Sequence, residues 1–226
     1  MKDRILVVCA HPDDETLGCG GTIRRLADEK HDIRIAILGE GLGARCQAGR
    51  KPDTAAIKNA ALKAGRILGS REISFFDLPD NRFDSVDLLD IVKKVEDIIG
   101  RFKPNIIFTH HCADLNMDHC LTHRAVLTAA RPLPANRGIR DIYAFETLSS
   151  TEWSFGQYGR QFCPDIFYDI TKSYKAKAMA LAVYKTEMRK FPHPRSGSAM
   201  LANAKKWGSC SGRGLAEAFE TIRSIR

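Results

Sequence analysis

Residues 11 to 15 bring one imidazole and three carboxylates together in a short stretch, His-Pro-Asp-Asp-Glu. Carboxylates at the start of a helix cap its free N–H groups and favour its dipole, which explains one or two of these acids. Capping explains neither His11 nor the glycines that follow at 18–21, which weaken a helix. Imidazole and carboxylate groups together are typical ligands of a divalent metal ion. The stretch is therefore a candidate metal or acid–base site, with helix capping as the alternative.

A second stretch, residues 114–123, contains two histidines four residues apart, His119 and His123. On a helix this spacing puts both side chains on one face, a common arrangement in divalent-metal sites. A single histidine there would more often be a surface or core residue. Five of the seven histidines, however, fall in or beside the two stretches: His11, His110, His111, His119 and His123. This clustering favours a mixed histidine and carboxylate metal site.

Short apolar runs alternate with longer helix-like segments through the first two thirds of the chain. The runs predict buried strands at 5–10, 33–38, 73–78 and 105–110. An apolar stripe predicts a helix over 86–99, capped by Ser85 and ended by Gly100. Further patterns predict strands at 141–147, 165–170 and 217–224 and helices at 172–185 and 197–207.

Strands of this kind, separated by helices, are typical of a parallel sheet covered on both faces. We therefore expect an α/β protein: a single Rossmann-like domain over 1–226, with a mostly parallel sheet and helices on both faces. Ligands of such sheets bind beyond the carboxyl ends of the strands, which points to residues 11–15, 39–46 and 110–123. The turn after the first strand lacks the GxGxxG pattern of dinucleotide-binding folds. A metal site is therefore the sharper interpretation.

The hexapeptide Ala-His-Pro-Asp-Asp-Glu at 10–15, followed by Asp118-His119, resembles the PIG-L/LmbE-like family of zinc-dependent de-N-acetylases. The similarity continues through the motifs at 78–84, 114–116, 149–153, 193–196 and 216–219. The resemblance implies a Rossmann-like fold and hydrolysis of the acetamido group of an N-acetylglucosamine-type compound, in free, phosphate-linked or nucleotide-linked form. It also implies a small-molecule or glycoconjugate amino-sugar as the partner of the site.

Carried onto this sequence, the resemblance makes His11, Asp14 and His119 the ligands of Zn²⁺ or another divalent metal, and Asp13 the general base. Two neutral imidazoles and one carboxylate leave the metal a net positive charge and an open position for water. The metal lowers the pKa of that water from 15.7 to about 7. Because a carboxylate beside a dication keeps a low pKa, we expect Asp13 to be ionised.

The chain departs from the family at residues 116–119, which read Asn-Met-Asp-His where many members have His-Pro-Asp-His. The first histidine of that motif is thought to stabilise the oxyanion. Asn116 can donate a hydrogen bond to an oxyanion but not a proton. The proton for the leaving amine could then come from Asp13 or from His193, although a position in the loop before Pro194 explains His193 equally well.

Two further residues near His119 have expected supporting roles. Asp118 is expected to orient a ligating histidine, because such histidines usually donate their other N–H to an acceptor. His123 is expected to be a helper or a packed helix residue, because a fourth protein ligand would fill the position that water requires.

Arg45 and Arg195 are candidate substrate contacts, since the planar guanidinium suits phosphate and carboxylate groups. As surface residues, both arginines would need no such role to explain them. Trp153 could stack on a sugar ring or close the edge of the core.

Composition limits the remaining classes. The 226 residues are 44% hydrophobic and 27% charged, and no apolar run approaches the roughly 18 residues of a membrane-spanning helix. Seven scattered cysteines without a C-x-x-C pair indicate a reducing cytoplasm rather than a disulfide framework. Lys and Arg number 35 against 27 Asp and Glu, a net charge of +8 that leans toward a phosphorylated or nucleotide-linked substrate.

Two alternatives stay open at this point. A nucleotide- or nucleic-acid-binding module would suit the charge and the fold, but the sequence has no aromatic RNA-binding motif, helix-turn-helix pattern or concentrated basic helix. We therefore expect no nucleic-acid partner. An amidase acting on a non-sugar compound would keep the metal site and change only the substrate. The family often forms closed assemblies, so a homo-oligomer is a further expectation.

Overall fold

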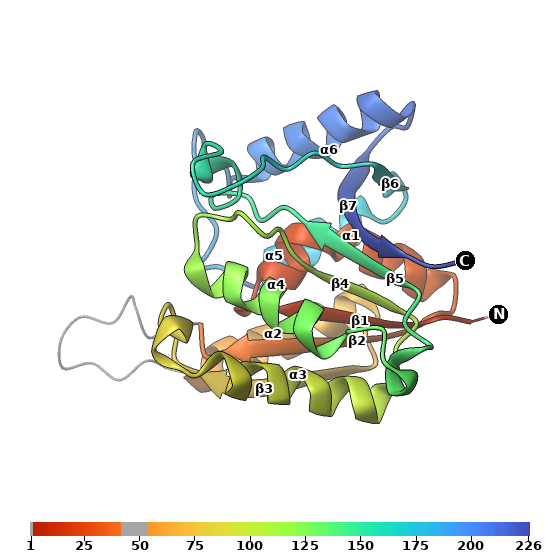
Figure 1. Cartoon of the computed structure of the whole chain (residues 1–226). Coiled ribbons are helices and arrows are strands. Elements are labelled where there is room, and N and C mark those ends of the chain that lie inside the picture. Colours follow the sequence, from red (N-terminus) through yellow and green to blue (C-terminus); the bar gives the residue numbers. More distant parts are fainter. Residues whose placement is uncertain (1, 42–53) are drawn as a thin grey trace, which may run out of the picture.

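The fold is built on one seven-stranded sheet (Figure 1). The structure is a computed structural model that describes residues 2–41 and 54–226. The strand order is β3-β2-β1-β4-β5-β7-β6; the first five are parallel, and β7 runs antiparallel to both β5 and β6. The strands are β1 (Arg4–Cys9), β2 (Asp32–Gly39), β3 (Glu72–Leu78), β4 (Ile106–His110), β5 (Asp141–Phe145), β6 (Ile166–Asp169) and β7 (Ala216–Ser224).

Helices cover both faces of the sheet, as the sequence predicted. One face packs against α1 (Asp14–Asp28), α2 (Thr54–Leu68) and α5 (Tyr174–Leu181), and the other against α3 (Leu88–Phe102) and α4 (Met117–Ala129) (Figure 1). The sixth helix, α6 (Gly197–Ser211), packs beside β6 and β7 at one edge.

Alternate residues of β1 belong to two separate cores, one on each face of the sheet. Ile5, Val7 and Cys9 belong to the core under α1 and α2, while Leu6 and Val8 belong to the core under α3 and α4. A strand buried on both faces needs apolar residues at every position. This requirement explains the continuous apolar runs that predicted the central strands.

The helix predicted over 86–99 lies slightly further along the chain. α3 follows Asp87 and ends at Phe102, so Ser85 is not its cap and Gly100 lies inside it. Ser85 instead belongs to a short 3-10 turn. The ring of Phe102 is fully buried on the apolar stripe, and this burial outweighs the roughly 1 kcal/mol by which glycine disfavours a helix. The other predicted elements are present; α5 ends four residues earlier than predicted and α6 four residues later.

The carboxyl ends of β1 and β4 bring the two histidine-containing stretches together. β1 and β4 are neighbours, and the strand order changes direction between them, since β2 flanks β1 and β5 flanks β4. Such a change of direction opens a crevice at the carboxyl ends of the strands. The chain leaves β1 through residues 10–13 into α1, and leaves β4 through residues 111–116 into α4.

The glycine-rich part of α1 is a break in the helix. Cys19 has non-helical angles, with φ of −142° and ψ of 21°. A Cβ atom at Gly18 would lie 2.2 Å from the ring of Phe145, so only glycine fits at this close approach. Gly18, which follows the first turn of α1, therefore packs directly against Phe145 at the end of β5.

A buried ion pair supplies hydrogen bonds at this break. Glu217 accepts the backbone N–H groups of Gly21 and Thr22 at 3.0 and 2.7 Å. Lys177 donates to the carbonyl oxygen of Leu17 at 2.8 Å and pairs with Glu217 at 2.5 Å. Backbone groups that the broken helix leaves without regular partners are thus satisfied by side chains of α5 and β7.

Candidate metal centre and active site

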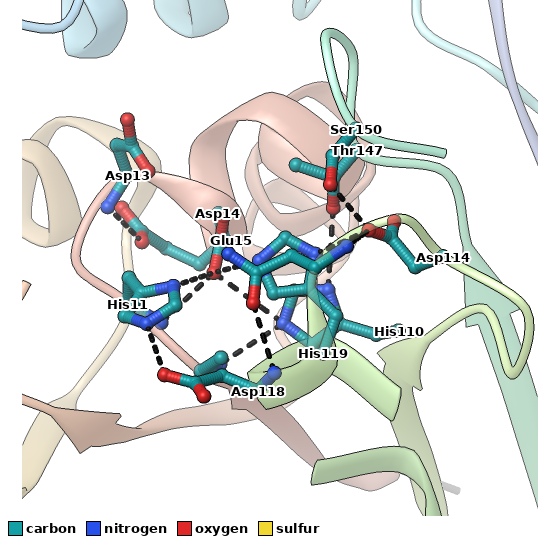
Figure 2. Close-up of polar contacts among 12 residues, drawn as sticks. His11, Asp13, Asp14, Glu15, His110, Asp114, Asp118, His119, Thr147 and Ser150 are labelled. Carbon is teal, nitrogen blue, oxygen red and sulfur yellow. Dashed lines mark hydrogen bonds and ion pairs between the residues drawn. The ribbon is translucent and has the colours of Figure 1, made fainter. Parts of the chain in front are cut away.

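The three predicted metal ligands lie together. The ligand atoms of His11, Asp14 and His119 are buried and all lie within 4.8 Å of one another. His11 Nδ1 is 3.6 Å and His119 Nε2 is 3.4 Å from the same oxygen, Asp14 Oδ2 (Figure 2). The loop after β1, the first residue of α1 and the first turns of α4 each supply one of them.

The remaining ring nitrogen of each imidazole faces another carboxylate. His11 Nε2 lies 3.0 Å from Asp118 Oδ2, and His119 Nδ1 lies 3.1 Å from Asp114 Oδ1 (Figure 2). Asp118 is itself fixed, because its other oxygen accepts the backbone N–H of Phe83 at 3.0 Å. Ligating histidines usually have one nitrogen on the metal and the other on such an acceptor. The geometry therefore leaves His11 Nδ1 and His119 Nε2 free for a metal.

Asp114 is a residue that the sequence reasoning did not single out. Its carboxylate accepts hydrogen bonds from the hydroxyl groups of Ser150 and Thr151 and from the backbone N–H of Asn116. Burial raises the pKa of Asp114, but the charge of His119 and these hydrogen bonds lower it to about 2. Its position five residues before His119, at the same strand end, was the available signal.

Asp14 fits a metal ligand because one of its oxygens is left without a partner. Asp14 Oδ1 is buried, yet no group within residues 2–41 and 54–226 hydrogen-bonds to it. Burial raises the pKa of Asp14, but His119 and His110 outweigh it and hold the pKa well below its usual value. A bound cation would satisfy this buried, ionised oxygen. Two imidazoles and one carboxylate are a donor set that Zn²⁺ accepts, with a fourth position left open.

The raised pKa values of the two imidazoles indicate the same excess of negative charge at the site. Burial lowers the pKa of His11, but hydrogen bonds to Asp118 and Asp14 raise it to about 9. Burial lowers the pKa of His119 too, and the charges of Asp14 and Asp114 raise it to about 10. A bound divalent cation would supply the positive charge that protons otherwise provide.

Asp13 lies beside the ligands, with its carboxylate in the pocket and its side chain buried. Its Oδ2 pairs with Arg195 Nη1 at 2.8 Å, and Arg195 also contacts Glu187 at 3.4 Å and donates to Ser149 Oγ at 2.8 Å. Burial raises the pKa of Asp13 to about 8, with Arg195 opposing the rise and Asp14 and Glu187 adding to it. The ionised state that we expect for Asp13 therefore depends on a second cation near it, in addition to Arg195.

Asn116 lines the pocket and caps α4. Its Oδ1 accepts the backbone N–H of Asp118 at 2.8 Å, and its Nδ2 donates to Asn81 Oδ1 at 2.9 Å. The amide has two N–H groups. One of them is thus left for another acceptor.

His193 lies at the rim of the same pocket. Its Nδ1 accepts the backbone N–H of Arg195 at 3.1 Å, which places the proton of the neutral ring on Nε2. Burial and the charges of Arg195 and Arg189 lower the pKa of His193 below its usual value. Its ring packs edge-to-face against Trp153, with centroids 5.4 Å apart.

His110 lies against the predicted metal ligands, with its Nε2 3.4 Å from Asp14 Oδ2, whereas His123 lies outside this pocket. His123 Nδ1 donates to the carbonyl oxygen of His110 at 2.8 Å, and His123 is not among the residues that line this pocket. The ring of His110 stacks on His119 with centroids 4.0 Å apart, and its Nε2 accepts the N–H of Ala10. Burial and the charge of His119 lower the pKa of His110 to about 4. His110 therefore supports the ring of His119 as a neutral imidazole.

The three predicted metal ligands line a polar pocket of about 260 Å³. Asp80 and Asn81, which follow β3, form part of its wall, and Asp80 Oδ1 lies 3.2 Å from His11 Nε2. Among the predicted strands, only the exits of the first, second and fourth were expected to carry the site. The exit of β3 lies on the same edge of the sheet, so the same rule would have found both residues. Arg45 lies outside the described residues.

This arrangement is that of a metal-dependent α/β hydrolase. Residues 6–130, more than half of the chain, match the family described as PIG-L, GlcNAc-PI de-N-acetylase, and the chain belongs to this family. The chain is also similar to a probable N-acetyl-alpha-D-glucosaminyl L-malate deacetylase 2 of Bacillus cereus. The two are 26% identical over 194 residues, which cover 83% of this chain and 84% of the relative.

Solved structures share the fold. N,N'-diacetylchitobiose deacetylase from Pyrococcus horikoshii has a TM-score of 0.78 at 17% identity, covering 97% of this chain and 83% of that one. The 4-carboxy-2-hydroxymuconate hydratase from Pseudomonas putida has a TM-score of 0.77 at 23% identity, covering 100% and 98%. One fold thus supports different reactions, and the site residues carry the functional argument. Among the described helices, none combines the length and apolar character that crossing a bilayer requires.

Proposed function

We propose that this chain hydrolyses the acetamido group of an N-acetylated amino sugar, with Zn²⁺ held by His11, Asp14 and His119. The observation that carries the proposal is the unsatisfied, buried oxygen of Asp14 between two imidazoles, beside a second pocket carboxylate, Asp13. When bound, the metal supplies the positive charge that polarises the amide carbonyl and lowers the pKa of water.

Asp13 is the general base of the proposed reaction. Its ion pair with Arg195 holds the carboxylate at the pocket wall, where it accepts the proton of the attacking water. The protonated Asp13 then donates this proton to the leaving amine. Two features support Asp13 over His193 as the acid: the lowered pKa of His193 keeps its ring neutral near pH 7, and the ring lies at the rim. Arg195 thus acts through Asp13 in addition to any contact with substrate.

Asn116 stabilises the oxyanion that develops on the acetamido oxygen. Its capping oxygen is bound to the backbone of α4 and one N–H to Asn81, so the side chain is fixed. The second N–H is the donor available to the pocket. A fixed donor aimed at developing charge contributes more than one that must reorient.

Sugar recognition is assigned to the outer wall of the pocket. Asp80 and Asn81 offer acceptors and a donor for hydroxyl groups, and Trp153 offers an aromatic edge and face. Arg189 lies at the rim with its guanidinium donating to the carbonyl oxygens of Thr186 and Met188. This cation supports a phosphate- or nucleotide-linked substrate. A cytoplasmic location and a homo-oligomeric state stay predictions.

The test is acetate release. Protein loaded with one Zn²⁺ per chain is incubated with N-acetylglucosamine, its phosphates, its nucleotide conjugates and simple non-sugar acetamides, beside Asp13→Asn as control. We expect acetate from at least one sugar and none from the variant. Acetate from the non-sugar acetamides alone would make the chain an amidase of another class. Acetate from no compound, with metal bound, would contradict the proposal.

A further inference from the structure

The carboxylate of Glu15 is fully buried and does not line the pocket. Its Oε2 accepts the backbone N–H of Asp13 at 3.0 Å (Figure 2). Its Oε1 accepts the hydroxyl groups of Thr16 at 2.6 Å and Tyr184 at 2.7 Å. None of the roles proposed above for metal binding or proton transfer uses this residue. A charged side chain taken out of water and given three donors needs another explanation.

The backbone of Asp13 has an unusual conformation that Glu15 fixes. Asp13 has φ of 106° and ψ of −28°, a region that side chains with a Cβ atom rarely occupy. Its N–H is bound by Glu15, and its carbonyl oxygen accepts the N–H groups of Thr16 and Leu17 at 2.9 and 2.8 Å. With both backbone groups bound, the direction of the Asp13 side chain is set. Such conformations persist only where the surroundings enforce them, and they concentrate at active sites.

Tyr184 connects this arrangement to the segment after α5. Its ring is buried in the apolar core under α1 and α2, so its hydroxyl reaches Glu15 from a fixed position. Three residues later, Glu187 contacts Arg195, which pairs with the carboxylate of Asp13. The segment therefore reaches Asp13 by two routes, one to its backbone and one to its side chain.

We propose that Glu15, held by Tyr184, is a positioning residue that keeps Asp13 in the left-handed conformation and so directs its carboxylate into the pocket. The inference rests on the proposed role of Asp13 as the base. Glu15 acts only through Asp13 and touches neither substrate nor metal.

Three variants and one control separate positioning from general destabilisation. Glu15→Met removes the acceptor for the Asp13 N–H and keeps an apolar side chain of similar length. Glu15→Gln keeps it, because the amide oxygen can accept that N–H while the NH₂ group donates to the two hydroxyl oxygens. Tyr184→Phe removes only the remote hydroxyl. Tyr168→Phe removes a tyrosine hydroxyl near the same core without contact to Glu15.

Crystal structures of the zinc-loaded variants give the first readout, which does not depend on activity. We expect Asp13 to leave the positive φ region in Glu15→Met and to keep it in Glu15→Gln and Tyr168→Phe. The kinetics use the substrate that the acetate-release assay identifies. We expect kcat to fall at least about tenfold in Glu15→Met and about threefold in Tyr184→Phe. KM and zinc content should stay unchanged, which is the signature of an interaction made only in the transition state.

A double-mutant comparison gives the decisive result. If Glu15 acts through Asp13, adding Glu15→Met to Asp13→Asn produces no further loss of kcat. An equal further loss would show a purely structural role and overturn the proposal, as would an unchanged Asp13 conformation in both Glu15→Met and Tyr184→Phe. A changed conformation with full turnover would instead contradict Asp13 as the base while leaving its positioning by Glu15 intact. Should Glu15→Met fail to fold, Tyr184→Phe carries the same tests.

Discussion

The inner wall of the pocket and its rim are built differently. On the inner wall, His11 faces three carboxylates and His119 faces two, and Asp114 accepts three hydrogen bonds. At the rim, Trp153 is 38% exposed, and the guanidinium of Arg189 donates to the carbonyl oxygens of Thr186 and Met188. The wall is thus fixed by many mutually supporting contacts, whereas these two rim residues make fewer contacts with their neighbours. This difference implies that the reaction is set by the wall and the choice of substrate by the rim.

The largest effect is expected from removing a metal ligand. His119→Ala should lose bound zinc and lower kcat/KM by at least about 1000-fold, because both the cation and its charge stabilisation are lost. A chelator should do the same to the native protein, with activity restored by added Zn²⁺. Metal content by elemental analysis and acetate release are the measurements. His123→Ala, on the same helix, is the matched control and should keep its metal; zinc retained by His119→Ala would exclude that residue as a ligand.

Replacing the base should leave the metal in place. Asp13→Asn is expected to lower kcat by about 100- to 10,000-fold, the range for loss of a general base. Zinc stoichiometry should stay at one per chain, since Asp13 is not a ligand. The comparison with His119→Ala therefore separates metal binding from proton transfer. Turnover equal to that of the native chain would remove Asp13 from the mechanism.

A smaller loss is expected at Asn116. Asn116→Ser keeps an oxygen that can cap α4 but lacks the amide N–H. We expect kcat to fall about 10- to 100-fold with little change in KM, because the donor acts on the charge that develops in the transition state. Thermal unfolding should shift by only a few degrees, which serves as the check on the cap. A loss confined to KM would indicate a substrate-binding role instead.

The rim should give the smallest effects. Arg189→Gln is expected to raise KM about three- to tenfold for a phosphate-linked substrate and to leave kcat unchanged, because the guanidinium binds substrate and transition state alike. The unphosphorylated sugar should show no change, and it provides the internal control. An equal effect on both substrates would refute recognition of an anionic group by Arg189.

The sequence predicted the centre of the site better than its supports. The strand-end rule and the family motif pointed to His11, Asp14 and His119, and these three residues lie together where β1 and β4 leave the sheet. The pairing of Arg195 with Asp13 joins residues 182 positions apart and depends on how the loop after α5 folds back. Neither spacing nor composition contains that information. Gly100 shows a different limit of prediction from sequence. A glycine here was expected to end the helix, but α3 continues through it because Phe102, two residues later, is buried.

The ion pair at the break in α1 makes the amino-terminal half depend on the far end of the chain. A fragment ending at residue 130, where the family match stops, would retain the three proposed metal ligands. It would lack Glu217 and Lys177, so the amides of Gly21 and Thr22 and the carbonyl of Leu17 would lose the partners they have in the full chain. Through Glu217, the motif at 216–219 thereby supports α1 although it does not line the pocket. Truncation or tagging that disturbs β7 should accordingly destabilise α1, which lies some two hundred residues earlier in the chain.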